Sequence, residues 1–212
     1  MGKTTAAGEL TTKVLLIRHG HVEGINPWRF RGRNDLPLTQ LGRAQAEAVA
    51  QRVATTWKPS AVYASPMSRA LDTARAIARR FELPVRADPD LLEIDYGQWH
   101  GLTREDVVAK WPSEGDLWFN SPDQAHIPGG ERLRDVHART SRGIRNLVER
   151  HPNETIVIVA HEAINRVVLL GALELPLSHY WRFRQGPCCI NELDFEGGKC
   201  IVSSINDTAH VP

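Results

Sequence analysis

The sequence predicts an α/β fold: a single-domain, three-layer α/β/α sandwich with a mostly parallel central sheet. Three apolar runs of strand length alternate along the chain with segments of helical periodicity, a pattern typical of parallel sheets covered by helices on both faces. The runs are residues 14–17, 61–64 and 156–160. The chain of 212 residues is long enough for one domain that buries about 70% of its unfolded surface.

The first half of the chain supplies two of these strands and two helices. The first strand, residues 14–17, is followed by a long polar loop over residues 22–37. A loop of this length inside a domain is usually functional. Thr39 is the expected N-cap of a helix whose apolar residues recur with helical spacing. The strand at 61–64 leads into a second helix, which opens with Arg69.

The second half begins with an irregular passage, residues 91–101. We expect residues 103–128 to form one or two short helices, an insertion that makes the rim selecting the substrate together with the loop over residues 28–33. A long amphipathic helix from Leu133 to Val148 follows, and the strand at 156–160 turns directly into another helix. The chain then ends in an expected hairpin, which turns at residues 196–198.

Composition and charge narrow the class of protein. A net charge of +1 argues against a general nucleic-acid or membrane-surface binder. No apolar run reaches the length of a membrane span, and the N-terminus lacks the core of a signal peptide. Three cysteines do not make a disulfide framework and suit a reducing compartment. We therefore expect a cytoplasmic protein, with residues 1–12 as a disordered leader.

Cationic and imidazole side chains follow all three predicted strands. Arg18 and His19 end the first, Arg69 lies just beyond the second, and His161 ends the third. Ligands of open α/β sheets bind beyond the carboxyl ends of the strands, so these side chains are expected to converge. Two other interpretations stay open from pattern alone. Arg18 and His19 can simply cap a strand at the surface, and Arg69 can pair there with Asp72 or Glu93.

The converging residues suit a doubly charged tetrahedral anion. Arginine forms bidentate, charge-assisted hydrogen bonds to phosphate oxygens, and a neutral imidazole such as that of His19 can attack phosphorus. Phosphoryl transfer also needs an acid to protonate the leaving oxygen. Glu93 is the best candidate, because a nearby anionic ligand raises a carboxyl pKa. The residues thus favour phosphate-ester chemistry.

A metal site is the main chemical rival. His19 and His21 have the His-x-His spacing of metal-dependent hydrolases, and His161 with Glu162 can add ligands. Two arginines in the same pocket would repel a divalent cation, however. We therefore expect no metal and no other cofactor.

These motifs resemble the histidine phosphatase superfamily, the phosphoglycerate mutase-like group, and within it the small bacterial phosphatases. The resemblance runs from about Lys13 to the end of the chain, so residues 13–212 form the expected histidine phosphatase domain. The motifs that carry it are Arg18-His19-Gly20 after a buried strand, Arg69 in Ser65-Pro66-Met67-Ser68-Arg69-Ala70, Glu93 in Leu92-Glu93-Ile94-Asp95-Tyr96-Gly97, and His161 after a buried strand. The likeness is closest to members that carry Trp181, Gln185 and Cys188-Cys189-Ile190-Asn191-Glu192 near the end.

The resemblance implies a role for each motif residue. His19 would be the phosphohistidine nucleophile, with Arg18, Arg69 and His161 completing the phosphate pocket and Glu93 donating the proton. Substrate contacts would also come from Asn26, Gly32 and the backbone amide of Glu162.

This chain departs from the family pattern in three places. The loop asparagine, Asn26, stands one place late, His21 replaces a common glutamate, and Glu162 replaces a common glycine. A carboxylate beside a phosphate is unfavourable unless it turns away or meets a cationic group.

Three functions are compatible with the resemblance. Mutases hold a second anionic group with extra basic residues after the glutamate motif, and here that interval offers Arg104, Lys110 and His126 alone. The first expectation is therefore a phosphatase that hydrolyses a small-molecule phosphomonoester through a phosphohistidine. Mutase-type transfer and a non-catalytic phosphate-binding protein are the alternatives. An exposed sheet edge can also pair with a second copy, so a homodimer is a further expectation.

Overall fold

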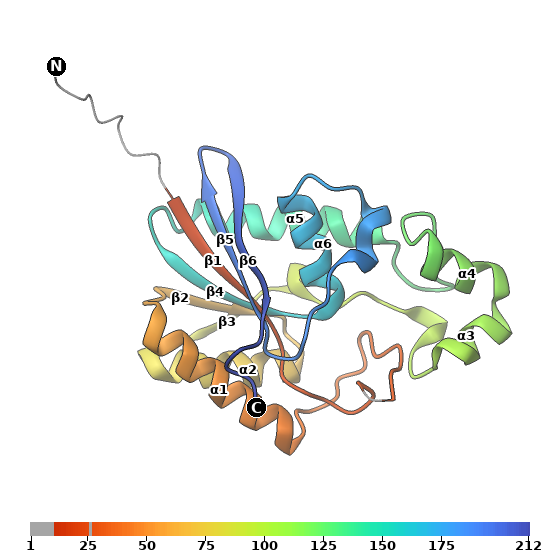
Figure 1. The fold of residues 1–212 in the computed structure, drawn as a ribbon, viewed down its shortest axis with the longest axis horizontal. Coiled ribbons are helices and arrows are strands. Elements are labelled where there is room, and N and C mark those ends of the chain that lie inside the picture. The colour runs from red at the N-terminus through yellow and green to blue at the C-terminus, as the bar shows by residue number, and fades with distance from the viewer. Residues whose placement is uncertain (1–10, 26) are drawn as a thin grey trace.

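The apolar runs form the middle of one six-stranded sheet in a computed structural model that describes residues 11–25 and 27–212 (Figure 1). In chain order the strands are β1 (Thr11–Arg18), β2 (Ala61–Ala64), β3 (Val85–Ala87), β4 (Thr155–Ala160), β5 (Ile190–Glu196) and β6 (Lys199–Asp207). Their order across the sheet is β3-β2-β4-β1-β5-β6. β1 to β4 are mutually parallel, while β5 and β6 run antiparallel to their neighbours. The prediction of a mostly parallel sheet is confirmed.

The helices pack on both faces of this sheet, as the alternating pattern predicts. They are α1 (Gln40–Thr56), α2 (Ser68–Ala78), α3 (Arg104–Lys110), α4 (Pro112–Asn120), α5 (Leu133–Glu149) and α6 (Glu162–Ala172). The expected N-cap of α1 is present, since the Thr39 hydroxyl accepts a hydrogen bond from the Gly42 amide. Short 3₁₀ turns occur at Arg79–Phe81, Pro89–Leu91, Gly97–Trp99 and Leu177–Arg182.

Each face of the sheet has its own hydrophobic core, because successive strand residues point to opposite sides. Leu15 and Ile17 of β1 pack with α1 and α2, whereas Val14 and Leu16 pack with α5 and α6. Figure 1 shows α5 and α6 above the sheet and α1 and α2 below it. The three layers match the predicted sandwich.

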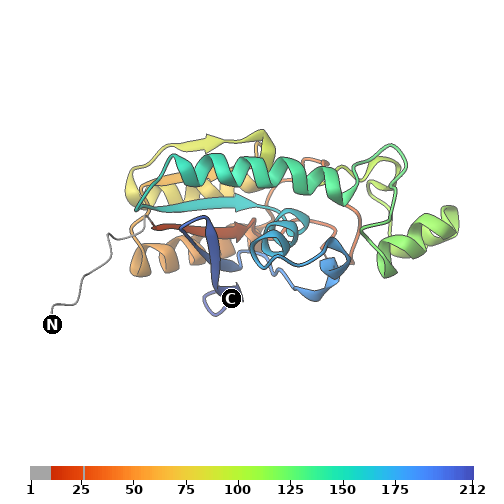
Figure 2. The same ribbon diagram turned by 90° about the horizontal axis from the view of Figure 1, so that it is seen from above.

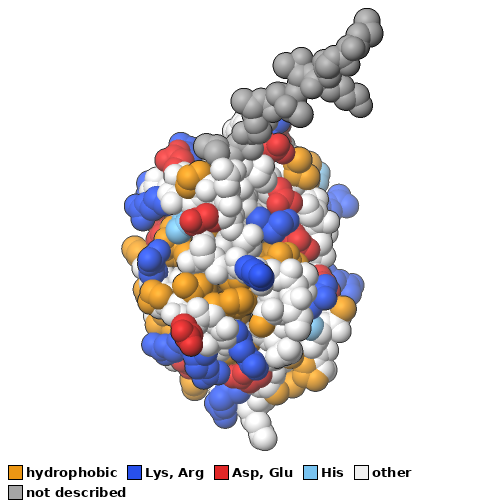
Figure 3. Space-filling view, turned by 90° about the vertical axis from the view of Figure 1, so that its left-hand side faces the viewer, with side chains coloured by type: hydrophobic (Ala, Val, Ile, Leu, Met, Phe, Trp, Pro, Cys, Tyr) orange, Lys and Arg blue, Asp and Glu red, His pale blue; other side chains and the backbone are white. Residues whose placement is uncertain are grey.

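The insertion after the irregular passage forms α3 and α4, as expected from residues 103–128. Figure 2 shows these two helices at one end of the molecule, beyond the carboxyl ends of the parallel strands (Figure 2). The opposite end carries interspersed positive, negative and small apolar patches (Figure 3), as the nearly balanced charge of the sequence suggests. Within the described residues, α3 and α4 thus cover only one end of the sheet. It is the end at which β1, β2 and β4 finish.

Two details differ from the prediction. β1 begins at Thr11, so the strand includes the last two residues of the expected 1–12 leader, and residues 1–10 lie outside the described residues. The strand β3 was not predicted, because a three-residue, largely exposed edge strand has no periodicity to detect. In the described part of the chain, no helix is long and apolar enough to cross a membrane.

Candidate active site

His19 lies at the point where β1 ends, and the geometry of its ring fixes its tautomer. The side chain is 1% exposed. Its Nδ1 lies 2.7 Å from the carbonyl oxygen of Gly20, and a carbonyl can only accept, so Nδ1 carries the proton. The lone pair is therefore on Nε2, which accepts a hydrogen bond of 3.2 Å from Nε of Arg69. The unprotonated nitrogen faces the cationic part of the site.

The surroundings of His19 keep this imidazole neutral. Burial and the positive charge of Arg69, with smaller contributions from His161 and Arg18, hold the pKa of His19 well below its ordinary value. A protonated imidazole has no lone pair to attack with, so the low pKa preserves a nucleophile at neutral pH.

Gly20 is needed because two backbones meet there. A Cβ atom at Gly20 would lie 2.4 Å from the carbonyl oxygen of Gly42 in the first turn of α1, and one at Gly42 would lie 2.1 Å from the carbonyl of His21. The glycine after His19 thus lets α1 begin against the strand end that carries His19.

Arg69 reaches the same place from the first turn of α2. It is 1% exposed, and its Nη1 and Nη2 donate hydrogen bonds of 2.8 Å to the carbonyls of Asn34 and Gly32. The surface alternatives for Arg69 are therefore wrong, and Asp72 pairs with Arg75 at 2.7 Å instead. Burial lowers the pKa of Arg69 to about 10, a value at which the guanidinium is still charged at neutral pH.

His161 completes the group from the end of β4. Its ring packs edge-on against His19 with centroids 5.2 Å apart. The side chain is fully buried, yet neither ring nitrogen has a hydrogen-bond partner among the described residues. Leaving a buried polar group unsatisfied costs about 1–3 kcal/mol. Burial and the charge of Arg69 hold the pKa of His161 well below its ordinary value. Two unsatisfied nitrogens beside the neutral imidazole of His19 and the cations of Arg18 and Arg69 indicate a ligand site.

Arg18 lies directly before His19, and its side chain contacts the Gln185 backbone and the Glu162 carboxylate. Its Nη1 donates to the backbone carbonyl of Gln185, and its Nη2 forms an ion pair of 3.0 Å with Glu162 that lacks hydrogen-bond geometry. The Gln185 side chain donates to Asn191 at 2.8 Å, and Asn191 in turn donates to the backbone of β1. A buried amide network thus fixes the segment that holds Arg18.

Glu93 lies in the irregular passage after β3 and is 6% exposed. Its Oε1 accepts a hydrogen bond of 3.0 Å from the amide of Ile94. Burial raises the pKa of Glu93, although Arg69, the Ile94 amide and Arg31 act in the opposite direction. A carboxyl group with a raised pKa is suited to donate a proton near neutrality.

Glu162, the unusual residue after His161, lies among three arginines. Its carboxylate pairs with Arg166 at 2.9 Å, Arg18 at 3.0 Å and Arg31 at 3.6 Å. Burial alone would raise the pKa of Glu162, but these three cations outweigh it and lower the pKa. The carboxylate therefore meets cationic groups of the protein itself, which resolves the apparent conflict with an anion site.

Sequence reasoning did not name Arg31 or Arg166 as individual site residues, although it placed the loop over residues 28–33, which contains Arg31, at the substrate rim. Arg166 stands four positions after Glu162 on α6, and that spacing places the two on the same helix face. This spacing could have identified Arg166 as a partner of Glu162 from the sequence. Arg31 lies in the long loop before Thr39, where charge alone does not distinguish a pocket residue from a solvated one.

A narrow pocket opens beside these groups. Its free volume is about 10 Å³, and its lining residues are Trp28, Arg29, Arg31, Gly32, Glu93, Tyr96, Glu162, Arg166, Tyr180 and Trp181. The strand-end residues are not in this wall but are joined to it through the contacts of Arg69 with Gly32 and of Arg18 with Glu162. Gly32 is thus at the pocket as predicted, whereas Asn26 lies outside the described residues.

The helical insertion packs against aromatic residues that line the pocket. Trp118 of α4 is buried in the core, and its carbonyl accepts a hydrogen bond of 2.9 Å from Nε1 of Trp181. Phe119 stacks on the Trp181 ring, with centroids 5.9 Å apart. Trp118 also packs against the rings of Tyr96 and Tyr180, so the insertion contacts the pocket wall through these aromatic residues and through Trp181.

The two histidines of the His-x-His pair have different partners. Nδ1 of His21 lies 2.9 Å from the Thr39 hydroxyl at the start of α1, while His19 contacts Arg69. Over residues 11–25 and 27–212, no group of three or more His, Cys, Asp or Glu side chains is placed to hold a metal ion.

Comparison with known proteins identifies the family. The family model of the histidine phosphatase superfamily (branch 1) matches residues 14–208 of this chain. The chain belongs to this superfamily. Among its relatives, phosphoserine phosphatase 1 of Hydrogenobacter thermophilus is 30% identical over 199 residues, which cover 94% of each chain.

Solved structures of the superfamily share the same fold. Bacillus stearothermophilus YhfR superimposes with a TM-score of 0.89 at 29% identity, covering 95% of this chain and all of the other. The phosphoserine phosphatase of Entamoeba histolytica, solved in complex with 3-phosphoglyceric acid, gives a TM-score of 0.85 at 30% identity, with 95% and 100% coverage. The alignments with these three proteins cover 94–95% of this histidine phosphatase superfamily member.

A Glu162→Gln variant tests the balance of charge in the pocket. We expect lower thermal stability, because breaking a buried ion pair leaves cations uncompensated and costs about 3–5 kcal/mol. We also expect inorganic phosphate to raise the Tm of this variant more than that of the unaltered protein, because the added anion no longer competes with Glu162 for Arg18 and Arg31. Thermal melts with and without phosphate measure both effects. A phosphate-induced rise no larger than in the unaltered protein or in the exposed-site variant Glu149→Gln would contradict this.

Proposed function

We propose that the protein is a metal-independent phosphatase that hydrolyses a small-molecule phosphomonoester through a phosphohistidine on His19. Nε2 of His19 attacks phosphorus, and the bond from phosphorus to the ester oxygen breaks. Glu93 donates a proton to that oxygen, which leaves as an alcohol. Water then attacks the phosphohistidine, Glu93 accepts the proton of the water, and inorganic phosphate and free His19 result.

The observation that carries this proposal is the orientation of the His19 ring. Its protonated Nδ1 is held by a backbone carbonyl, so its lone pair on Nε2 faces the guanidinium of Arg69. A phosphoryl group bound by Arg69, Arg18 and His161 would sit next to that lone pair. Positioning of this kind and charge neutralisation are the main sources of rate in phosphoryl transfer.

The organic part of the substrate would contact the aromatic wall of the pocket. Trp28, Tyr180 and Trp181 lie there, and Arg166 lies 4.8 Å from the Trp181 ring centroid. Relatives named for phosphoserine and glucosyl-3-phosphoglycerate phosphatase activity support a phosphomonoester hydrolase. We propose that residues 103–128 influence selectivity by holding Trp181 rather than by touching the substrate.

Phosphate release in excess chelator tests this function. With a panel of phosphomonoesters that includes phosphoglycerates, we expect turnover that chelator does not reduce. His19→Ala should lower kcat by about 10³-fold or more, because the covalent route is lost. The matched control is His137→Ala, on α5 and outside the pocket lining, and it should keep full activity. Loss of activity with chelator, full activity of His19→Ala, or an isomeric phosphoglycerate as the main product would each contradict the proposal.

A further inference from the structure

The segment that carries Glu93 has no regular secondary structure to hold it. Residues 92–96 lie between two short 3₁₀ turns, outside the sheet and all helices. A proton donor must be held within about 0.5 Å of its productive position, and ladder hydrogen bonds provide such rigidity for residues in strands. Something else must therefore hold this passage.

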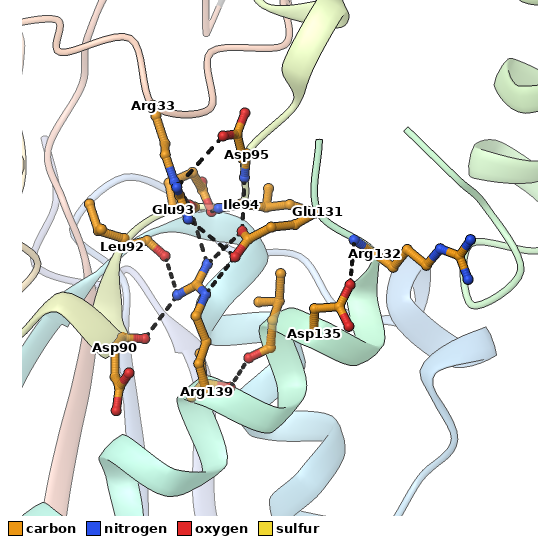
Figure 4. A network of polar contacts seen from close by, with 12 residues as sticks. Arg33, Asp90, Leu92, Glu93, Ile94, Asp95, Glu131, Arg132, Asp135 and Arg139 are labelled. Atoms are coloured by element: carbon orange, nitrogen blue, oxygen red, sulfur yellow. Dashed lines mark hydrogen bonds and ion pairs between the residues drawn. The ribbon is translucent and has the colours of Figure 1, made fainter. Parts of the chain in front are cut away.

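Arg139 of α5 contacts the passage through its whole guanidinium group. Nη1 donates to the carbonyls of Asp90 at 2.9 Å and Leu92 at 2.6 Å, and Nη2 donates to the carbonyl of Glu93 at 3.3 Å. The side chain of Arg139 is 13% exposed. Three backbone carbonyls, those of residues 90, 92 and 93, thus share one rigid, planar donor (Figure 4).

Glu131 fixes Arg139 and the next part of the passage. It accepts hydrogen bonds of 3.0 Å from both Nε and Nη2 of Arg139, and a third of 3.0 Å from the backbone amide of Asp95. Its own amide donates to the carbonyl of Asp95 at 2.9 Å. Residue 95 is therefore held on both its amide and its carbonyl.

Arg33 joins the same network from the long loop that also lines the pocket. Its Nε donates to the carbonyl of Glu93 at 3.2 Å, and its Nη2 pairs with Glu131 at 3.1 Å. Figure 4 shows Arg33, Glu131 and Arg139 converging on the backbone around Glu93. Within the described residues, no hydrogen bond or ion pair joins the Glu93 carboxyl group to Arg139 or Glu131, and the hydrogen bonds of this network to residue 93 go to its backbone carbonyl.

We propose that Arg139 and Glu131 are positioning residues for the proton donor: they clamp the backbone of residues 90–95 and thereby hold the Glu93 carboxyl at the leaving oxygen. This inference rests on the proposed function, in which Glu93 protonates that oxygen. It assigns a role to two residues that do not touch the reacting atoms.

A comparison of leaving groups separates positioning from mere stability. A phenolate such as p-nitrophenolate leaves without protonation, whereas an alkoxide needs the acid. We expect Arg139→Met to lower kcat/KM for β-glycerophosphate by about 10–100-fold, since a displacement of 1 Å costs rates of this order. The kcat/KM for p-nitrophenyl phosphate should change less than about 3-fold. This ratio covers only the steps up to departure of the leaving group, so it leaves out the shared hydrolysis of the phosphohistidine, in which Glu93 acts as a base.

The chain offers a matched control and a second variant. Arg142 lies on the same helix and pairs with the Asp90 carboxylate at 2.6 Å, but it is largely exposed and contacts no carbonyl of the passage. Arg142→Met should therefore leave kcat/KM for both substrates unchanged.

Glu131→Gln keeps the side-chain shape and replaces Arg139→Met in the test if that variant does not fold. It should show the same selective loss of kcat/KM for β-glycerophosphate. Arg139→Lys should not restore the rate, because an ammonium cannot reproduce the planar fork.

Glu93→Gln, measured alongside, makes the outcomes distinguishable. The positioning role is supported if Glu93→Gln and Arg139→Met both lose kcat/KM selectively with β-glycerophosphate. It is overturned if Glu93→Gln shows that selectivity while Arg139→Met and Glu131→Gln lower kcat/KM equally for the two substrates or leave both values unchanged. Equal losses of kcat/KM for both substrates in Glu93→Gln would instead overturn the assignment of Glu93 as acid, and the positioning role with it.

Discussion

Replacing Arg69 by alanine is expected to lower kcat/KM by about 10³-fold, the order seen when a cationic stabiliser of a phosphoryl-transfer site is lost. Arg69 donates to the nucleophilic ring of His19 and also holds the carbonyls of Gly32 and Asn34. The variant thus loses both the charge on the phosphoryl group and the geometry of the loop. Steady-state kinetics with any accepted monoester measures the effect.

Arg75→Ala is the control for this experiment. Arg75 lies on the same helix, is exposed, and pairs with Asp72 alone among the described residues. It should keep full activity. Arg69→Lys keeps the charge but not the fork, so it should recover only part of the loss. Equal activity of Arg69→Ala and Arg75→Ala would show that Arg69 has no part in the reaction.

Glu93→Gln is expected to give the second large effect, a fall in kcat/KM of about 10²–10⁴-fold for an alkyl monoester. Glutamine keeps the size of the side chain and cannot donate an acidic proton. Circular dichroism and thermal melts should show a folded protein, because an uncharged group suits this buried position. Rates close to those of the unaltered enzyme would mean that protonation comes from another group.

The pH dependence of kcat/KM provides an independent check on the same residue. Burial raises the pKa of Glu93, so its acid form persists to a higher pH than that of an ordinary carboxyl and is lost as the pH rises through the raised pKa. The alkaline fall in kcat/KM should therefore disappear in Glu93→Gln. The pKa of His19 is lowered, so the nucleophile stays neutral well below its ordinary value of 6.5. The acidic fall should accordingly lie below that pH.

The sequence predicted those features that follow from buried strands. Arg18, His19 and His161 directly follow apolar runs, and Arg69 lies just beyond a third, so parallel pairing alone brings them to one edge of the sheet. The hydrogen bond from Arg69 to His19 confirms this convergence for two of the strand ends, and the contact of the two histidine rings confirms it for the third.

The supporting residues were not predictable in the same way. Arg139 lies on an amphipathic helix, where a charged residue ordinarily faces solvent, and its buried contacts depend on where the irregular passage folds. Glu162 appeared unfavourable beside a phosphate until α6 and the long loop brought Arg166 and Arg31 to it. Roles that arise from tertiary contacts between irregular segments carry no periodic signal in the sequence.

The covalent intermediate is the central claim, and trapping it tests the account most directly. The enzyme is mixed with a ³²P-labelled phosphomonoester, quenched within milliseconds in alkali, and mapped by peptide mass spectrometry, because phosphohistidine is labile in acid. We predict phosphate on the peptide containing His19, absent in His19→Ala and present in the control His137→Ala. Rapid turnover with no labelled His19, or the same label in His19→Ala, would contradict the mechanism.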